Sequence, residues 1–272
     1  MKVKKNNLVN SVETDRKRII SSSSPFGVKE AYRALYTNIL YLPTEDSSKK
    51  IVVTSTFSGE GKTTLSINLA LTIATNSPES EVLLIDADLR SPRLTELLGN
   101  GDKNVHGLSE YLVGIDEIPN IYSTKYNNLH VLNSGASSVN SPGLLSTSKF
   151  KTLMDYCKDK FKYVIIDTPP VGIVSDAVLL SDKVDGYIVV TRSGSSDVAS
   201  VGETVKALES VNAKVFGFVL TSYNAKNGGK YGRYTKGSYG KYGKYGRYGR
   251  YSRYEKYESS FRRYEEIEEN KK

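Results

Sequence analysis

The sequence predicts an α/β domain in which helices cover both faces of a mostly parallel, doubly wound β-sheet. Two observations carry this prediction. Short runs rich in Val, Ile and Leu alternate with longer amphipathic segments from residue 26 to residue 220, as strands do when crossover helices connect them. One of these strand-to-helix connections is also a glycine-rich turn that ends in Lys, Thr and Thr.

That turn has the composition of a phosphate-binding loop. The strand Ile51–Val53 precedes it, and Ser66–Ala70 opens the amphipathic helix that follows. Glycines allow successive N–H groups to point at phosphate oxygens, and the positive end of the helix adds to the field. The lysine would reach the β- and γ-phosphates, and the first threonine would ligate Mg²⁺. The nucleotide-binding residues expected here are Ser58, Gly59, Glu60, Gly61, Lys62, Thr63 and Thr64. One departure stands out, because the strict pattern has Gly where this chain has Thr56.

Three parts are expected along the chain of 272 residues. Residues 1–24 are polar and predict a flexible arm, residues 25–224 form the α/β domain, and residues 225–272 form a tail of different composition. No stretch reaches the roughly 18 apolar residues of a membrane span, and no apolar region follows the basic start. With one cysteine and two histidines, a disulfide is excluded and a Cys/His zinc site is not expected.

The remaining strands and helices of the domain alternate along the chain. Together with the phosphate loop, this alternation predicts a P-loop NTPase fold. Further strands are expected at Val82–Ile85, at Leu129–Leu132, within 161–170 ending at Asp167, at Gly186–Thr191 and at Val215–Leu220. Helices are expected at Phe26–Leu42, Gly107–Val113, Ser148–Lys160, Val174–Leu180 and Asp197–Val211.

The first helix presents one charged pair. Ser24 and Pro25 predict its N-cap and first helical position. Glu30 and Arg33 lie three residues apart on a polar stripe beside the apolar one. Such a pair by itself is typical of a solvated helix face.

Acidic residues stand at the ends of two predicted strands. Asp86 and Asp88 follow Val82–Ile85, and Asp167 ends the strand that precedes Pro169 and Pro170. Ligands of open α/β sheets lie at the carboxyl ends of the strands. Beside a phosphate loop, these acids predict a Mg²⁺-nucleotide site for phosphoryl transfer, in which Lys62 and Mg²⁺ neutralise charge and an acid accepts a proton from the attacking hydroxyl.

The tail carries the whole net charge of the chain. Residues 225–272 hold 14 Lys/Arg and 6 Asp/Glu, a net charge of +8, so the remaining chain is neutral. The tail contains no Val or Leu and a single Ile, which predicts disorder. Ten of the twenty tyrosines lie in it: Tyr231, Tyr234, Tyr239, Tyr242, Tyr245, Tyr248, Tyr251, Tyr254, Tyr257 and Tyr264.

Taken together, these motifs resemble the bacterial tyrosine kinases of capsule and exopolysaccharide systems. Residues 59–64 resemble the Walker A loop of that family, residues 83–92 its Walker A′ motif and residues 164–170 its Walker B motif. The Glu30-Ala-Tyr-Arg33 segment resembles its N-terminal oligomerisation helix, and the tyrosine-rich tail resembles its autophosphorylation site. The resemblance covers roughly residues 25–272.

The resemblance implies a role for each residue. Thr63 would ligate Mg²⁺ directly, and Asp88 and Asp167 would hold it through water. Asp86 is favoured as the base for a tyrosine hydroxyl, with Asp88 as the alternative. Two departures are present: the family helix usually reads Glu-x-x-Arg-x-x-Arg, but here Tyr36 takes the third position, and Thr221 stands after the last strand where relatives often carry Asn.

The resemblance also implies partners and a location. The kinase would autophosphorylate its tail in trans within a ring-shaped homo-oligomer and regulate polysaccharide synthesis and export. A membrane-embedded adaptor of the polysaccharide co-polymerase type would activate it, and a cognate tyrosine phosphatase would reverse the reaction. Its place would be cytoplasmic, at the inner face of the cell membrane through the adaptor.

Two other functions compete with the kinase interpretation. A spatial-positioning or partition ATPase of the same fold would carry a second lysine five residues before Lys62, where this chain has Phe57. A tail of Tyr, Gly and Arg could also stack on bases and neutralise phosphates, although nucleic-acid binding is not expected for a tail attached to this domain.

Overall fold

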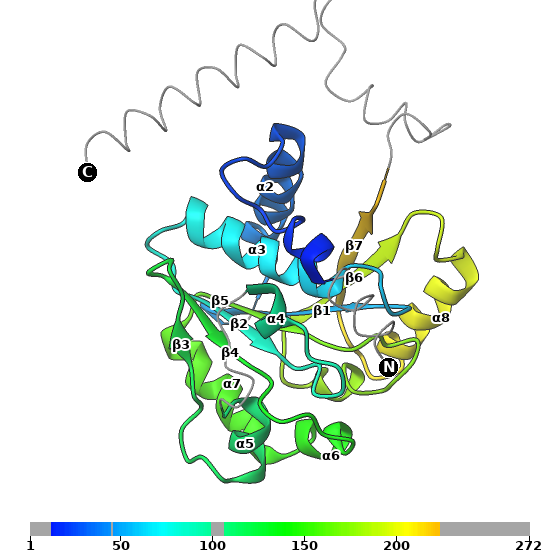
Figure 1. Cartoon of the computed structure of the whole chain (residues 1–272). Coiled ribbons are helices and arrows are strands. Elements are labelled where there is room, and N and C mark those ends of the chain that lie inside the picture. The colour runs from blue at the N-terminus through cyan, green and yellow to red at the C-terminus, as the bar shows by residue number, and fades with distance from the viewer. Residues whose placement is uncertain (1–11, 45, 99–105, 224–272) are drawn as a thin grey trace, which may run out of the picture. The chain divides into compact units, whose positions relative to one another are not determined.

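The computed structural model describes residues 12–44, 46–98 and 106–223 (Figure 1). Within them, seven strands form one sheet in the order β3-β4-β2-β5-β1-β6-β7. The strands are β1 (Lys49–Ser55), β2 (Val82–Asp86), β3 (Tyr122–Ser123), β4 (Leu129–Leu132), β5 (Tyr163–Asp167), β6 (Gly186–Arg192) and β7 (Val215–Thr221). All neighbouring strands are parallel except β3, which pairs antiparallel with β4 at one edge. The predicted fold class is confirmed, and the antiparallel edge strand adds to it.

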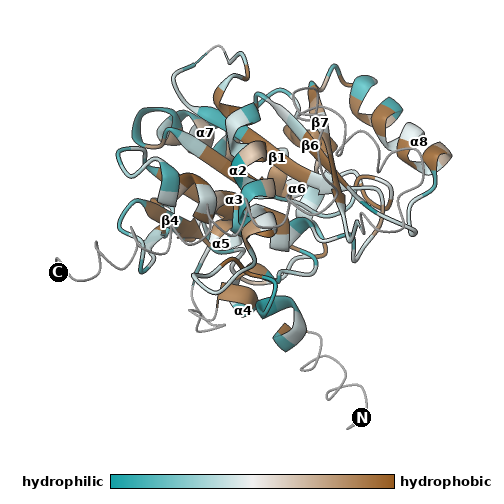
Figure 2. Cartoon of the chain, turned by 90° about the horizontal axis from the view of Figure 1, so that it is seen from above, coloured by the Kyte–Doolittle hydropathy of each residue, from teal (hydrophilic) through white to brown (hydrophobic). Residues whose placement is uncertain are grey.

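Helices cover both faces of the sheet, as the strand–helix alternation predicted (Figure 1). Side chains of α2 (Phe26–Leu40), α3 (Lys62–Asn76) and α4 (Leu94–Leu98) form one buried cluster with one face of the strands. Side chains of α5 (Leu108–Val113), α6 (Ser141–Leu145), α7 (Ser148–Lys160), the 3-10 turn η1 (Val178–Leu180) and α8 (Val198–Glu209) form the other. The central strands β1 and β5 are buried along their whole length, and their middle residues are hydrophobic (Figure 2), because both faces of the sheet are covered.

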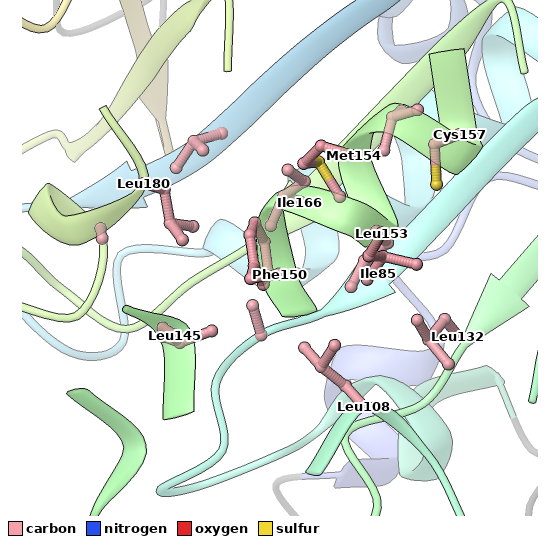
Figure 3. Packing of buried hydrophobic residues seen from close by; sticks show 14 of the residues in the cluster. Ile85, Leu108, Leu132, Leu145, Phe150, Leu153, Met154, Cys157, Ile166 and Leu180 are labelled. Atoms are coloured by element: carbon pink, nitrogen blue, oxygen red, sulfur yellow. The ribbon is translucent and has the colours of Figure 1, made fainter. Parts of the chain in front are cut away.

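Helix α7 fills the second layer. Its residues Phe150, Leu153, Met154 and Cys157 are buried and face Ile85 and Ile166 of the sheet (Figure 3). The helix has the predicted bounds, because its apolar residues recur at helical spacing. Burial raises the pKa of the Cys157 thiol to about 12, so this cysteine is a packing residue.

Helix α2 begins and ends differently from the prediction. It starts at Phe26, and the Ser24 hydroxyl accepts a hydrogen bond from the Ser21 N–H (3.0 Å) and does not cap the helix. At its other end the buried Lys49 ammonium donates to the carbonyls of Ile39, Leu40 and Leu42 at 3.0, 2.9 and 2.7 Å. A cation at the negative end of a helix dipole is favourable, so the first strand of the sheet fixes the end of α2.

Two predicted segments are wrong. The helix expected over Val174–Leu180 is reduced to the three-residue turn η1, because Ala177 directs its carbonyl to the Tyr187 hydroxyl (2.8 Å) and buried Asp176 binds other segments. Of the flexible arm expected over residues 1–24, residues 1–11 lie outside the described residues, whereas residues 12–24 begin with a helical turn over 12–16 and bond to α3. The short elements α4, α6 and β3 were not predicted, since two to five residues carry no readable periodicity.

Two further expectations depend on what the structure describes. No helix among the described residues is long and apolar enough to cross a membrane. The predicted tail, residues 225–272 with its ten tyrosines, lies outside the described residues. The chain divides into two units between residues 222 and 223, two residues before the predicted boundary.

The cap of α2 gives a first testable prediction. Replacing Lys49 by Met removes the donor to two carbonyls of the last turn of α2 and to the Leu42 carbonyl just beyond it. We therefore expect the free energy of unfolding to fall by about 1–3 kcal/mol in urea denaturation. The neighbouring variant Lys50→Met is the control, because Lys50 is also buried but, among the described residues, makes a single ion pair, with Asp46 at 3.2 Å, and caps no helix, so we expect a smaller loss. Equal losses for the two variants would contradict the capping role.

Candidate functional site

The strand order brings the predicted motifs together at one edge of the sheet. Strand β5 lies between β1 and β2, so the three carboxyl ends are neighbours. In register, Asp167 is opposite Asp86 on one side and Val53 on the other. The phosphate loop leaves β1 just beyond Ser55, and Asp88 follows β2 by two residues. Separate motifs of the sequence therefore meet where ligands of α/β sheets bind.

The phosphate loop uses glycine where its backbone requires it. Gly59 and Gly61 have φ angles of 80° and 98°, in the region that other residues rarely adopt, and Gly61 is the N-cap of α3. Behind the loop, the Thr221 hydroxyl donates to the Glu60 carbonyl at 2.7 Å. The residue that replaces the Asn common in relatives thus holds the loop from the end of β7.

Glu60 fastens the loop to the segment after β6. Its side chain is buried, and the carboxylate accepts from the N–H of Phe57 (2.8 Å), from the N–H of Arg192 (3.3 Å) and from the Ser196 hydroxyl. The Arg192 guanidinium in turn donates to the Gly59 carbonyl at 3.2 Å. The loop is therefore held in shape from the side opposite to the phosphates that its N–H groups would bind.

Thr56 explains the departure from the strict loop pattern. Among the described residues, positive φ outside glycine occurs at Asn212 and Ser222, so Thr56 has ordinary backbone geometry and needs no glycine. Its buried hydroxyl accepts from that of Thr204 in α8 at 3.0 Å. Gly172 supplies the close approach instead, because a Cβ there would lie 2.3 Å from the Thr56 carbonyl oxygen.

Asp167 faces the start of α3. The Thr63 hydroxyl donates to one carboxylate oxygen at 2.6 Å and the Ser66 hydroxyl to the other at 3.0 Å. Burial raises the pKa of Asp167 to about 6, against the opposing effects of the Lys62 charge and of the two hydroxyl donors. The sequence did not single out Ser66, although its place one turn after Lys62 on the same helix could have indicated it.

Asp86 is fully buried, whereas Asp88 is partly exposed. Burial raises the pKa of Asp86 well above its usual range, and the charges of Asp167 and Asp88 add to the effect. The carboxylate accepts from the N–H groups of Asp88 and Leu94, both at 3.2 Å. Burial also raises the pKa of Asp88, whose carboxylate accepts from the Ser91 N–H at 3.0 Å while the Lys62 charge opposes the rise.

An ion pair that the sequence did not indicate holds the loop after Asp88. The Arg90 guanidinium donates to both oxygens of Asp176 at 3.0–3.2 Å, and the Ser141 hydroxyl donates to the same carboxylate. Asp176 is fully buried, so these hydrogen bonds compensate for the loss of its contacts with water. Arg90 belongs to the predicted Walker A′ segment, but no local pattern marks Asp176 or Ser141.

The donors at this edge fit one kind of metal site. Thr63, Asp88 and Asp167 offer oxygen atoms, which suit Mg²⁺. Over the ranges that the structure describes, no group of three or more His, Cys, Asp or Glu could hold an ion by itself. Such a site fits Mg²⁺ that arrives with a nucleotide, since Mg²⁺ is usually held by one or two carboxylates together with phosphate oxygens.

The predicted oligomer pair lies on α2, away from these motifs in the chain. The Arg33 guanidinium donates to Glu30 at 2.6 Å, and both side chains are partly exposed. Tyr36 is buried and packs edge-on against Tyr163 of β5, with ring centroids 6.1 Å apart. The position where the family usually has Arg therefore belongs to the core in this chain.

Comparison with known proteins gives consistent results. Residues 46–234 match the ParA family model, described as an NUBPL iron-transfer P-loop NTPase. The chain is 37% identical to tyrosine-protein kinase CpsD of Streptococcus pneumoniae serotype 4 over 193 residues, which cover 71% of this chain and 83% of that protein. It is 30% identical to tyrosine-protein kinase YwqD of Bacillus subtilis, over 79% of this chain and 90% of that protein.

Solved structures agree with these relatives. The kinase domain of Escherichia coli tyrosine kinase ETK superposes with a TM-score of 0.66 and 32% identity, covering 72% of this chain and 78% of that chain. The chimerical protein CapA2B2 gives 0.65 and 32%, covering 73% and 85%. The septum site-determining protein MinD of Pyrococcus horikoshii with Mg-ADP gives 0.53 and 25%, covering 64% and 70%.

Proposed function

Because the chain belongs to the bacterial tyrosine-protein kinase family, within the ParA type of P-loop NTPases, we propose that it transfers the γ-phosphoryl group of ATP to protein tyrosine hydroxyls. The observation that carries the proposal is that Lys62, the first residue of α3, converges with Asp86, Asp88 and Asp167 at neighbouring strand ends, in a chain with this identity to kinases. Phosphoryl transfer needs positioning and charge neutralisation, and this edge of the sheet offers both.

Each residue of the phosphate loop has a task in this proposal. The N–H groups of residues 58–64 bind the α- and β-phosphates, and the Lys62 ammonium neutralises charge that develops on the transferred group. The Thr63 hydroxyl and the carboxylates of Asp88 and Asp167 would hold Mg²⁺. Mg²⁺ supplies charge neutralisation at the β- and γ-phosphates.

Asp86 is the proposed base for the incoming tyrosine. Burial raises the pKa of Asp86 in the nucleotide-free protein, and the charges of Lys62 and Mg²⁺ would favour the ionised form that accepts the tyrosine proton. The two backbone N–H groups that bind the carboxylate fix its orientation. Asp88 is the alternative, because its side chain is partly exposed and an incoming hydroxyl could reach it more easily than the buried Asp86.

The acceptors we propose are the tail tyrosines, phosphorylated in trans within a ring-shaped homo-oligomer. They are Tyr231, Tyr234, Tyr239, Tyr242, Tyr245, Tyr248, Tyr251, Tyr254, Tyr257 and Tyr264. Tethering a tail beside a neighbouring site raises its effective concentration. The activity would regulate polysaccharide synthesis and export from the inner face of the membrane, with a co-polymerase-type adaptor as activator and a tyrosine phosphatase as antagonist.

Two other functions found in proteins of this fold have weaker support in this chain. A positioning ATPase would need a lysine at residue 57, but Phe57 stands there and its N–H bonds to Glu60. Iron transfer would need several thiolates for a cluster, but Cys157 is the single cysteine and is fully buried.

The central experiment replaces Lys62 by Met. Loss of the loop ammonium should lower tyrosine phosphorylation by about a hundredfold or more, because a transition-state charge is removed. The purified chain would be incubated with ATP and Mg²⁺, with and without an adaptor peptide, and its phosphotyrosines located by mass spectrometry. Unchanged circular dichroism would exclude unfolding, and phosphorylation at the parental level would contradict the assignment.

The two acids of the Walker A′ segment can be separated. Asp86→Asn should leave Mg-ATP affinity within a few fold of the parent and lower transfer by about 10²–10⁴-fold, because it removes a general base. Asp88→Asn should instead raise the Mg²⁺ concentration required for half-maximal activity. Nucleotide affinity and initial rates against Mg²⁺ would be measured for both variants, and parental transfer by Asp86→Asn would eliminate Asp86 as the base.

The ring contact can be tested on α2. Replacing Glu30 and Arg33 together by Ala should lower the mass measured by light scattering, if these partly exposed side chains make the contact between subunits. ATP should lower the mass of the parent as well, because phosphorylation makes the tails repel. A mass that responds to neither change would argue against the proposed ring.

A further inference from the structure

The N-terminal segment 12–20 makes hydrogen bonds to α3, which follows the phosphate loop, and to α4, which follows Asp86 and Asp88. We call it the N-terminal clasp. It begins with the helical turn over 12–16, and Val12 and Ile19 pack on the buried cluster of the α2, α3 and α4 layer. Its polar contacts involve both backbone and side chains, and they are directed at α3 on one side and at α4 on the other.

Asn68 of α3 anchors one end of the clasp. This residue is almost fully buried, and all its polar atoms are used. The side-chain oxygen of Asn68 accepts from the Ile20 N–H at 2.8 Å. Its side-chain NH₂ group donates to the Arg18 carbonyl at 2.9 Å and to the Tyr32 hydroxyl of α2 at 3.1 Å. One buried amide therefore joins the clasp to the phosphate-loop helix and to the helix of the proposed ring contact.

The other end of the clasp holds the start and the end of α4. The Asp15 carboxylate accepts from the Arg93 guanidinium at 2.9 Å, and the Arg93 carbonyl accepts the first bond of α4, from the Leu97 N–H at 3.0 Å. The Arg16 guanidinium donates to the Glu96 carbonyl at 2.8 Å. Both ends of the helix are thus tied to the clasp.

Helix α4 has little stability of its own. It is five residues long, and isolated helices shorter than about 12–15 residues are marginal in water. Tertiary contacts must therefore decide where it lies. Its first N–H, that of Leu94, donates to the Asp86 carboxylate at 3.2 Å, so the position of α4 sets one of the two backbone bonds that orient Asp86.

We propose that the N-terminal clasp positions Asp86 for phosphoryl transfer by fixing α4, with Asp15, Arg93 and Asn68 as positioning residues. The inference rests on the proposed kinase function and adds to it a route through Asn68 and Tyr32 from α2 to the acid. Loosening the clasp lets the Leu94 N–H move away from Asp86, while the phosphate loop keeps its own supports at Glu60 and Thr221. Catalysis then falls more than nucleotide binding.

The test uses Asp15→Ala, Arg93→Ala and their combination in the full chain. We expect each single variant to lower kcat by about three- to tenfold with nucleotide Kd within about twofold, and the double variant to be no worse than the worse single one. Arg18→Ala is the matched control, because Arg18 also pairs with Asp15 (2.7 Å) but is largely exposed and does not reach α4. It should behave as the parent, and Asp15→Glu should recover part of the lost rate.

Hydrogen exchange of the nucleotide-free protein gives a readout independent of activity. The peptide that spans residues 86–98 should take up deuterium faster in Asp15→Ala and in Asn68→Ala than in the parent and in Arg18→Ala. The proposal that the clasp fixes α4 would be wrong if hydrogen exchange over residues 86–98 were unchanged. It would also be wrong if the losses of kcat in Asp15→Ala and Arg93→Ala were additive, or if Arg18→Ala lost as much activity. Faster exchange with parental kcat would overturn its positioning role. A parent without kinase activity would refute the proposed function, and the exchange result would still decide whether the clasp holds α4.

Discussion

The site depends on two carboxylates buried side by side. Asp86 and Asp167 end adjacent parallel strands in register, and burial raises the pKa of both. The Asp167 charge adds to the rise at Asp86, and the Asp88 charge adds to the rise at both. Such an arrangement costs stability in the free protein unless cations or hydrogen bonds compensate. Part of the compensation is present, in the hydroxyls of Thr63 and Ser66 and in two backbone N–H groups. The remainder would come from a bound cation, which is why this pair, more than the glycine loop alone, indicates a Mg²⁺-nucleotide site.

The phosphate loop is rigid for a different reason, because its supports come from elements far away in the sequence. Glu60 is bound by the segment after β6, the Glu60 carbonyl by Thr221 of β7, and Thr56 by Thr204 of α8. All three contacts lie on the β6–β7 side of β1, whereas the acids lie on the β5–β2 side. These contacts support the loop from the side away from Asp86 and Asp88, and the bond from Thr63 to Asp167 is its link to the acids. Preorganised N–H groups would bind phosphate at a smaller entropic cost. This separation is what allows a defect in α4 to affect transfer and spare nucleotide binding.

The sequence predicted most of the central sheet, because continuous Val, Ile and Leu runs are the signature of strands buried on both faces. The strand Leu129–Leu132 and the helix Ser148–Lys160 have the bounds that were predicted, and Asp167 ends its strand as expected. The two predictions that were wrong concern segments bound to residues far away in the sequence. The helix expected near Asp176 is interrupted where Asp176 pairs with Arg90, which is 86 residues away. Ordering of residues 12–24 is caused by Asn68, a residue that reads locally as one polar position in a helix.

A nucleotide site alone does not determine what the phosphoryl group is transferred to, since the cell division ATPase MinD of Pyrococcus furiosus has a similar fold. Features outside the nucleotide site must select the acceptor. The charge distribution suggests how a tyrosine segment would bind the site and be released after phosphorylation. The residues before 225 are neutral, while the tail carries +8 and ten tyrosines. A basic segment is attracted to a site that holds nucleotide phosphates. Each phosphotyrosine adds about −1.5 to −2 charges, so ten would add about −15 to −20. Such a tail would be repelled both by the nucleotide and by its neighbours. Product release and weakening of the oligomer would then follow from the same electrostatic change.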